Sequence, residues 1–187
     1  EVNYEDQLPW SISADGGGHS LQLSKPDYGE GSVRAWEGSS LVGGSPGQFD
    51  PLPVGALRDV VINEYLSHTD LPDTDYIELY NRGTQTVDIS GCGLSNTLTT
   101  NKFFIGSGTL IGAGDHVVYD QETLGFSLQA GGDEIFLWAP DFSYVVDAVR
   151  FNAQENGVSS GRYPDGASMW HVLSGQTPGV ANLSTEL

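Results

Sequence analysis

The chain has 187 residues, enough for one domain with an extension or for two small domains, and its formal net charge is −18. Such an acidic surface repels phosphate backbones and anionic membranes, so we expect no nucleic-acid partner, and without a long apolar run we expect no direct membrane insertion. Hydrophobic residues make up 38% and aromatic residues 10% of the chain, enough for a packed core, so the charge does not indicate disorder.

Residues 1–50 form an N-terminal extension with two short strand-like pieces, residues 1–4 and 19–23, between loops rich in glycine, serine, proline and acidic residues. Fifty residues bury little apolar area alone, so we expect the extension to pack on the domain that follows. Residues 51–56, with two prolines and a glycine, are a predicted linker. Residues 57–187 are the predicted domain.

Two predicted strands joined by an acidic loop lie at the centre of that domain. Residues 60–66 are rich in β-branched and aromatic side chains, and residues 76–80 alternate, with Ile77 and Leu79 on one face. Further short strand-like runs are separated by glycine-rich turns, and no window has helical periodicity with caps, so the fold class is all-β. A turn at residues 131–133 predicts a hairpin between residues 126–128 and 135–137.

Several motifs occur in an order typical of one family. They are Ile62-Asn63-Glu64, the Tyr-Ile-Glu-Leu-Tyr-Asn run at 76–81, Val-Asp-Ile-Ser-Gly at 87–91, Gly-Asp-Glu-Ile at 132–135, and Thr177-Pro178-Gly179 followed by Asn182. Over about residues 57 to 182 the chain resembles the lamin tail domain family as it occurs in bacterial surface and secreted proteins. The resemblance implies an immunoglobulin-like β-sandwich without catalytic function of its own. Cys92 stands where the family pattern has a tryptophan.

The N-terminal extension also resembles this family. Residues 9–21 are similar to the closing segment of another lamin tail domain, so the extension is interpreted as the end of a preceding repeat or as extra strands laid on the complete domain. The chain starts at Glu1 without a signal peptide, and we expect it to be a piece of a longer protein.

Catalytic chemistry finds little support. No G-x-S-x-G elbow is present, one cysteine and no H-x-x-x-H spacing leave no zinc site, and we expect no enzyme activity. The histidines, which lie in unrelated contexts and are expected to be solvent or strand-face residues, are His19, His68, His116 and His171.

The remaining conspicuous side chains have structural interpretations. Trp138 and Trp170 are expected to pack in the core or between sheets, and Cys92 to be a small buried hydrophobe. Glu64 and Glu78 lie at matched positions in the two central strands. We expect them to be hydrogen-bonded to backbone groups or paired with an arginine, either Arg58 or Arg82.

The acidic loop is the one constellation with metal chemistry. Asp70, Asp73 and Asp75 are spaced so that a curled loop could aim several oxygens at one Ca²⁺. The loop lacks the glycine of a calcium-binding D-x-D-x-D-G run, and Leu71-Pro72 interrupts it. A solvated connection between strands is therefore favoured over a bound ion.

Two functions follow as hypotheses. The favoured one is a non-catalytic spacer or interaction module of a larger exported or cell-surface bacterial protein, with neighbouring domains or other surface proteins as partners. The alternative is a calcium-dependent or carbohydrate-binding module that uses the acidic loop and the tyrosines Tyr28, Tyr76 and Tyr80.

Overall fold

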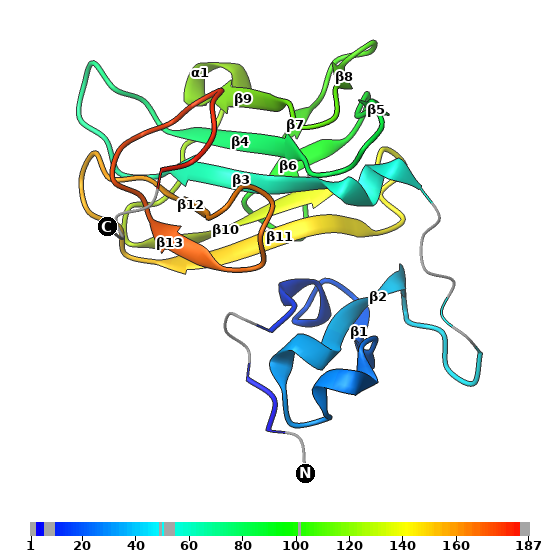
Figure 1. The fold of residues 1–187 in the computed structure, drawn as a ribbon. Helices are drawn as coiled ribbons and strands as arrows, with labels where there is room; N and C mark the ends of the chain where they lie inside the picture. The colour runs from blue at the N-terminus through cyan, green and yellow to red at the C-terminus, as the bar shows by residue number, and fades with distance from the viewer. Residues whose placement is uncertain (1–2, 6–9, 49, 51–54, 101, 184–187) are drawn as a thin grey trace.

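The computed structural model describes residues 3–5, 10–48, 50, 55–100 and 102–183. Two β-sheets face each other, and a small N-terminal unit lies against the outer face of one of them (Figure 1). The five-stranded sheet has the order β13 (Trp170–Val172), β12 (Ser160–Arg162), β3 (Val60–Leu66), β4 (Tyr76–Asn81) and β9 (His116–Asp120). The four-stranded sheet has the order β11 (Val145–Asn152), β10 (Gly132–Trp138), β6 (Gly93–Ser95) and β7 (Phe103–Phe104).

The other elements are short. Two-stranded sheets are formed by β5 (Val87–Asp88) with β8 (Leu110–Ile111), and by β1 (His19–Leu23) with β2 (Trp36–Val42). The one α-helix of the described residues is the single turn α1 (Gln121–Leu124), and the 3-10 turns are η1 (Ile12–Ala14), η2 (Pro26–Tyr28), η3 (Val33–Ala35) and η4 (Ala56–Asp59). The predicted all-β class and sandwich are therefore confirmed.

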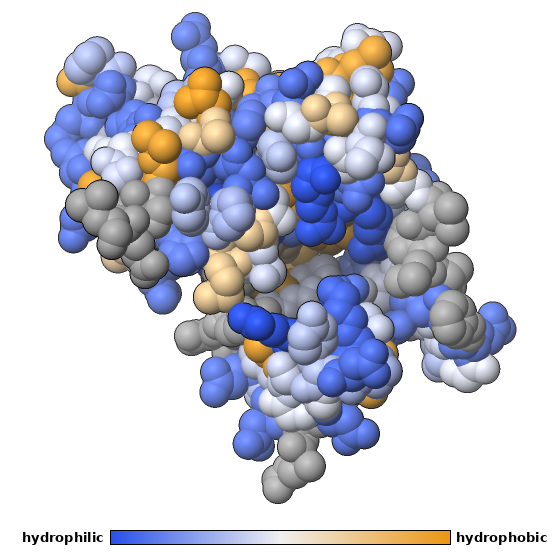
Figure 2. All heavy atoms as spheres, in the orientation of Figure 1, coloured by the Kyte–Doolittle hydropathy of each residue, from blue (hydrophilic) through white to orange (hydrophobic). Residues whose placement is uncertain are grey.

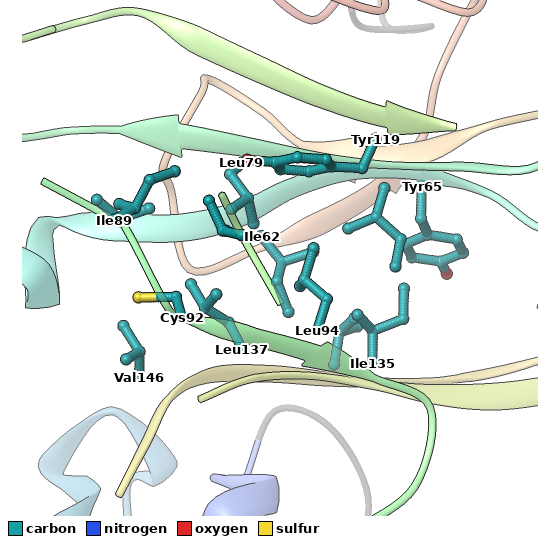
Figure 3. Packing of buried hydrophobic residues seen from close by; sticks show 14 of the residues in the cluster. Ile62, Tyr65, Leu79, Ile89, Cys92, Leu94, Tyr119, Ile135, Leu137 and Val146 are labelled. Carbon is teal, nitrogen blue, oxygen red and sulfur yellow. The ribbon is translucent and has the colours of Figure 1, made fainter. Parts of the chain in front are cut away.

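The main core fills the space between the two sheets (Figure 3). Ile62 and Leu79 on the five-stranded sheet and Ile135 and Leu137 on the four-stranded sheet are fully buried there. Alternation along each strand explains this, because every second side chain points to the same face. The central strands β3 and β4 thus form as predicted, and they pair with each other in antiparallel fashion.

Cys92 lies in this core and is 0% exposed. Burial raises the pKa of its thiol to about 11, so the group is neutral and behaves as a small hydrophobe, as expected. Figure 3 places it beside Leu137 and Val146. A tryptophan at this position would need a larger space between the sheets than this core leaves.

The prediction of a hairpin with its turn at residues 131–133 is wrong. Strand β10 pairs with β11 on one side and with β6 on the other, and no strand occupies residues 126–128. The side chain of Leu128 is buried, as it would be in a core strand. Its backbone N–H, however, donates to Asp75 Oδ2 at 2.9 Å and not to a neighbouring strand. A side chain therefore takes the place of a neighbouring strand at that amide.

The N-terminal unit packs on the outer face of the four-stranded sheet. Ile12 of η1 buries itself against Phe136 and Val145, and all three are at most 3% exposed. Strand β1 matches the predicted residues 19–23. The other predicted piece, residues 1–4, is not a strand at residues 3 and 4, and residues 1 and 2 lie outside the described range.

Polar contacts also hold the N-terminal unit on the sheet. His19, expected at the surface or on a strand face, is 5% exposed, and its Nε2 accepts a hydrogen bond from Val145 N at 3.0 Å. Its Nδ1 lies 2.6 Å from Ser39 O, so Nδ1 carries the proton and the ring is neutral. Arg150 Nη1 pairs with Asp15 Oδ2 at 2.7 Å. The predicted linker lies mostly outside the described residues, and the proposed domain boundaries stay a prediction.

Candidate functional site

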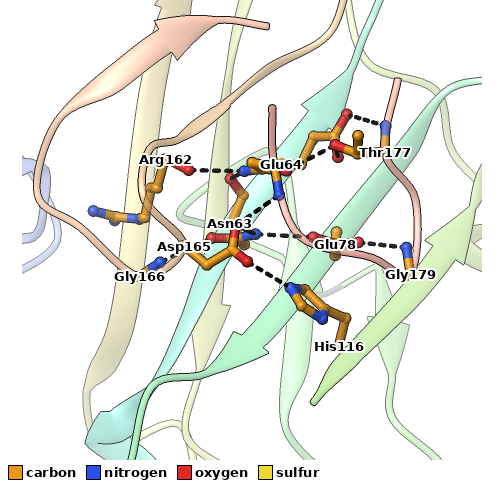
Figure 4. A network of polar contacts seen from close by, with 10 residues as sticks. Asn63, Glu64, Glu78, His116, Arg162, Asp165, Gly166, Thr177 and Gly179 are labelled. Carbon is orange, nitrogen blue, oxygen red and sulfur yellow. Dashed lines mark hydrogen bonds and ion pairs between the residues drawn. The ribbon is translucent and has the colours of Figure 1, made fainter. Parts of the chain in front are cut away.

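The outer face of β3 and β4 carries polar side chains that are nevertheless fully buried. Asn63, Glu64 and Glu78 are each 0% exposed. A β-bulge between Ile62 and Glu64 interrupts the alternation, so that both Asn63 and Glu64 face away from the main core while Ile62 and Tyr65 face into it. The three polar residues are buried because the chain after β12 folds back across them (Figure 4).

Glu64 is held by donors from two segments. Its Oε1 accepts hydrogen bonds from the Tyr76 hydroxyl and from Thr177 N, the latter at 3.1 Å. Its Oε2 lies 2.8 Å from Thr177 Oγ1, which is also 2.9 Å from Asn182 Oδ1. A hydroxyl has one proton, so Thr177 donates to one of these oxygens at a time. The carboxylate thereby fastens residue 177 to a strand 113 positions earlier.

Glu78 lies directly opposite Glu64 in the strand pairing. Its Oε1 accepts a hydrogen bond from Asn63 Nδ2 at 3.0 Å, and its Oε2 accepts one from Gly179 N at 2.6 Å. Burial raises the pKa of Glu78 to about 7, the nearby carboxylate of Glu64 adds to the rise, and the two hydrogen bonds oppose it. This carboxyl group therefore titrates near neutral pH in the folded protein.

Asp165 and Asn182 complete the network. Asp165 Oδ1 accepts hydrogen bonds from Asn63 Nδ2 at 3.2 Å and from Asn182 N at 3.0 Å, and its Oδ2 lies 3.2 Å from His116 Nε2 (Figure 4). The Asn182 amide donates to the backbone oxygens of Asn63 and Arg162 at 3.2 and 2.8 Å. The clamp, as we call the network around Glu64 and Glu78, thus joins β3 and β4 to each other and to the C-terminal segment.

Arg162 connects the clamp to the second sheet. Its Nε donates to Ile62 O at 2.7 Å, and its Nη2 pairs with Asp147 of β11 at 3.0 Å. Asp147 in turn accepts a hydrogen bond from Ile62 N at 2.8 Å. The pairing of β12 with β3 ends at Glu64, so this ion pair takes the place of a strand partner for the backbone N–H and C=O of Ile62.

The geometry of the clamp is that of a structural fastening. Glu64 and Glu78 are inaccessible to solvent, and their oxygens already accept hydrogen bonds from the chain itself. The expected backbone partners are present as Thr177 N and Gly179 N. The expected arginine partners are wrong: Arg82 instead donates to Arg58 O at 3.3 Å. Asp165 was missed as a partner, although it lies in the stretch that carried the resemblance.

Comparison with known protein families gave one match. The sequence model of the family described as Lamin Tail Domain matches residues 53–153, more than half of the chain. The chain belongs to the lamin tail domain family. Its β-sandwich is accordingly of the immunoglobulin-like type. No curated protein and no solved structure matches the chain.

This lamin tail domain extends past the matched residues. The match ends in a loop before β12, yet the hydrogen-bond partners of Asn63, Glu64 and Glu78 beyond it are Asp165, Thr177, Gly179 and Asn182. The closing motif Thr-Pro-Gly followed by asparagine is therefore explained by the polar groups it covers. Of the described residues, no helix is long and apolar enough to cross a membrane.

The acidic loop of this lamin tail domain does not bring its three aspartates together. Asp75 is 5% exposed, and its oxygens accept hydrogen bonds from Thr69 Oγ1 and Leu128 N at 3.1 and 2.9 Å. Asp70 Oδ2 accepts one from Asn156 Nδ2 at 2.6 Å. Within the described ranges no group of three or more His, Cys, Asp or Glu side chains could hold a metal ion. The solvated connection favoured from the sequence, and calcium binding by Asp70, Asp73 and Asp75 as its alternative, both stay predictions.

The aromatic residues that the sequence analysis considered for ligand binding or for packing differ in their exposure to solvent. Tyr76 is only 5% exposed, and its hydroxyl donates to Glu64, so it cannot serve as a ligand platform. Tyr28 is 58% exposed, and Tyr80 packs on the His116 ring at 4.7 Å between centroids. Trp170 packs against Tyr65 at 5.4 Å, which confirms its packing role.

Proposed function

We propose that this lamin tail domain is a non-catalytic spacer or interaction module of a larger exported or cell-surface bacterial protein. The observation that carries the proposal is the clamp: the most conspicuous acidic side chains of the motifs, Glu64 and Glu78, are fully buried and bind the chain's own C-terminal segment. They hold the fold together and offer no oxygen to a substrate. The family type, an immunoglobulin-like domain, is compatible with this role.

The N-terminal unit supports a place within a longer chain. It adds residues of its own to an outer face of the sandwich, through Ile12 against Phe136 and through Asp15 with Arg150. A module that accepts a preceding segment on one sheet face can transmit a fixed orientation from one domain to the next. The residues encoded upstream of Glu1 in the parent gene test this: a preceding lamin tail repeat or an export signal is the expected finding, and a cytoplasmic enzyme domain in their place would argue against it.

A mutational experiment distinguishes a structural from a catalytic role for Glu64. Removing a structural group lowers the free energy of unfolding, whereas active-site residues are commonly held at a cost to stability, so their removal leaves it unchanged or raises it. We expect Glu64→Gln to unfold at a lower urea concentration than the unmodified chain. The matched control is Glu155→Gln, an exposed glutamate, which should unfold like the unmodified chain. A Glu64→Gln variant of unchanged or increased stability would count against the structural role.

A further inference from the structure

A cleft of about 620 Å³ lies where the N-terminal unit meets the sandwich (Figure 2). Its walls come from two parts of the chain: residues 10–38 of the N-terminal unit and, on the sandwich, residues of η4, β3, β11 and β12 with Arg82 and residues 168–170. This volume is within the range of about 300 to 1,000 Å³ that small-molecule sites occupy. A ligand site here would go beyond the proposed spacer role.

The cleft gathers most of the positive charge of a strongly acidic chain. Five of the seven Lys and Arg residues line it, namely Lys25, Arg34, Arg58, Arg82 and Arg162. Only Glu37 and Asp147 among the lining residues are acidic, so the lining carries a net charge of +3 in a chain of −18. Repulsion between like charges disfavours such clustering unless an anion offsets it.

Among the residues that the structure describes, three of the arginines in the cleft form no ion pair with a carboxylate. Arg162 pairs with Asp147, and Lys25 pairs with Glu37 at 2.7 Å. By contrast, no described carboxylate lies in ion-pair contact with Arg34, Arg58 or Arg82, although the chain has 25 Asp and Glu residues.

Arg58 is half-buried, and its guanidinium group stacks on the Tyr144 ring at 4.7 Å from the ring centroid. Its Nη2 donates to Ser40 O at 3.2 Å, but its Nε is buried with no hydrogen-bond partner. This nitrogen is not exposed to the cleft, so Arg58 contributes positive charge to the lining and not a hydrogen bond to a ligand. Arg34 and Arg82 are exposed, so their guanidinium groups are accessible to a ligand.

Aromatic rings line the same cleft. Three of the four tryptophans of the chain are there, namely Trp10, Trp36 and Trp170. Tyr28 joins them and is 58% exposed, and Trp36 is half-buried. A ring of this kind offers a flat apolar face with a polar group at its edge, which suits a ligand whose rings are apolar on one side and polar at the rim.

We propose that this cleft binds an acidic saccharide, a short oligosaccharide that carries carboxylate or sulfate groups. Guanidinium groups donate paired hydrogen bonds to either anion, and the C–H faces of the sugar rings pack on Tyr28 and Trp36. A protein partner is disfavoured, because a stable protein interface is a broad surface of about 1,200 Å² or more in total, whereas this site is a hollow of small-molecule size. Nucleic acid is disfavoured because a long polyanion would extend beyond the cleft over a chain whose net charge is −18.

Calorimetric titration of the full chain tests the proposal. The probes are trigalacturonate, a heparin-derived tetrasaccharide and sialyllactose, and the comparison compounds are neutral maltotriose, hexaglutamate and a hexathymidylate. We expect at least one acidic saccharide to bind, its affinity to fall with added salt, and maltotriose not to bind. Binding should weaken about tenfold in Arg34→Gln and in Arg82→Gln, as expected when a charge-assisted hydrogen bond is lost. Tyr28→Ala should weaken it as well.

Lys102→Gln is the matched control, because it removes one exposed positive charge that does not line the cleft. It should leave binding within about twofold of the unmodified chain. The proposal is overturned if none of the three acidic saccharides binds at up to about 10 mM, or if Lys102→Gln weakens binding as much as the cleft variants. Equal or tighter binding of hexaglutamate or of the hexathymidylate would overturn it too. None of these results bears on the module role, which the Glu64→Gln unfolding test addresses separately.

Discussion

Replacing Thr177 with valine should loosen the clamp without changing its shape. The two side chains have nearly the same volume, so the change removes the hydroxyl that lies 2.8 Å from Glu64 Oε2 and 2.9 Å from Asn182 Oδ1. Glu64 is 0% exposed, so water cannot replace the lost donor. A hydrogen bond to a carboxylate in such a place contributes about 1.5 to 3 kcal/mol to stability, and we expect the free energy of unfolding to fall by about 2 kcal/mol.

Urea unfolding monitored by tryptophan fluorescence measures this loss. For a chain of this size about 2 kcal/mol corresponds to a fall in the melting temperature of roughly 4 to 8 °C. The matched control is Thr86→Val, at an exposed threonine, where the same change of side chain should shift stability by no more than about 0.5 kcal/mol. If Thr177→Val and Thr86→Val unfold alike, the hydroxyl of residue 177 does not fasten the C-terminal segment, and the clamp has been misread.

Three further predictions concern titratable groups. Burial raises the pKa of the Glu78 carboxyl group from 4.5 to about 7, so the folded state binds the proton of this group more tightly than the unfolded state does. The resulting contribution to the free energy of unfolding is fully present below pH 4.5 and is lost as the pH rises through about 7. Its size is about 3 kcal/mol, and urea unfolding of Glu78→Gln between pH 5 and 8 should lack it. Burial lowers the pKa of His19 below 6.5, so docking of the N-terminal unit is complete above pH 6.5 and weakens as the pH falls through the lowered value. Hydrogen-exchange protection of the Val145 amide, which donates to His19, reports this; protection that is unchanged at acid pH would contradict it. Burial raises the pKa of Cys92 to about 11, so a thiol reagent at pH 8 should label it only as fast as the chain unfolds, and rapid labelling of the native chain would show that the core is open there.

The local sequence pattern was sufficient to predict the strands β1, β3 and β4, because their formation depends on the side chains of residues that are neighbours in the sequence. Residues 60–66 and 76–80 form β3 and β4 because β-branched and aromatic side chains fit a buried pleated sheet, and the alternation of Ile77 and Leu79 selects the face that meets the core. Residues 19–23 form β1 for the same reason. The wrong hairpin at residues 131–133 shows the limit of this reasoning, because Asp75, more than fifty positions away, takes the amide that a partner strand would have used.

The role of the motif carboxylates depended on contacts across the whole chain. Alternation alone would place Asn63 and Glu64 on opposite faces, and the bulge that places them together is a property of the pairing with β4. Burial of Glu64 and Glu78 requires Thr177 and Gly179, about a hundred residues later, to fold over them.

The sequence by itself determined the fold class, the family and the acidic net charge of this lamin tail domain. The spacing of hydrophobic residues, the turn residues and the order of the motifs can all be read along the chain without knowledge of its tertiary contacts. Only the tertiary structure decided which polar side chains are buried and which are exposed to solvent. Net charge is a sum over the chain and conceals its distribution: the −18 total gives no sign that five of seven basic residues line one cleft. That cleft exists because the N-terminal unit docks on the sandwich, which places Arg34 and Arg82 in the lining of one cleft through packing that no short stretch of sequence encodes.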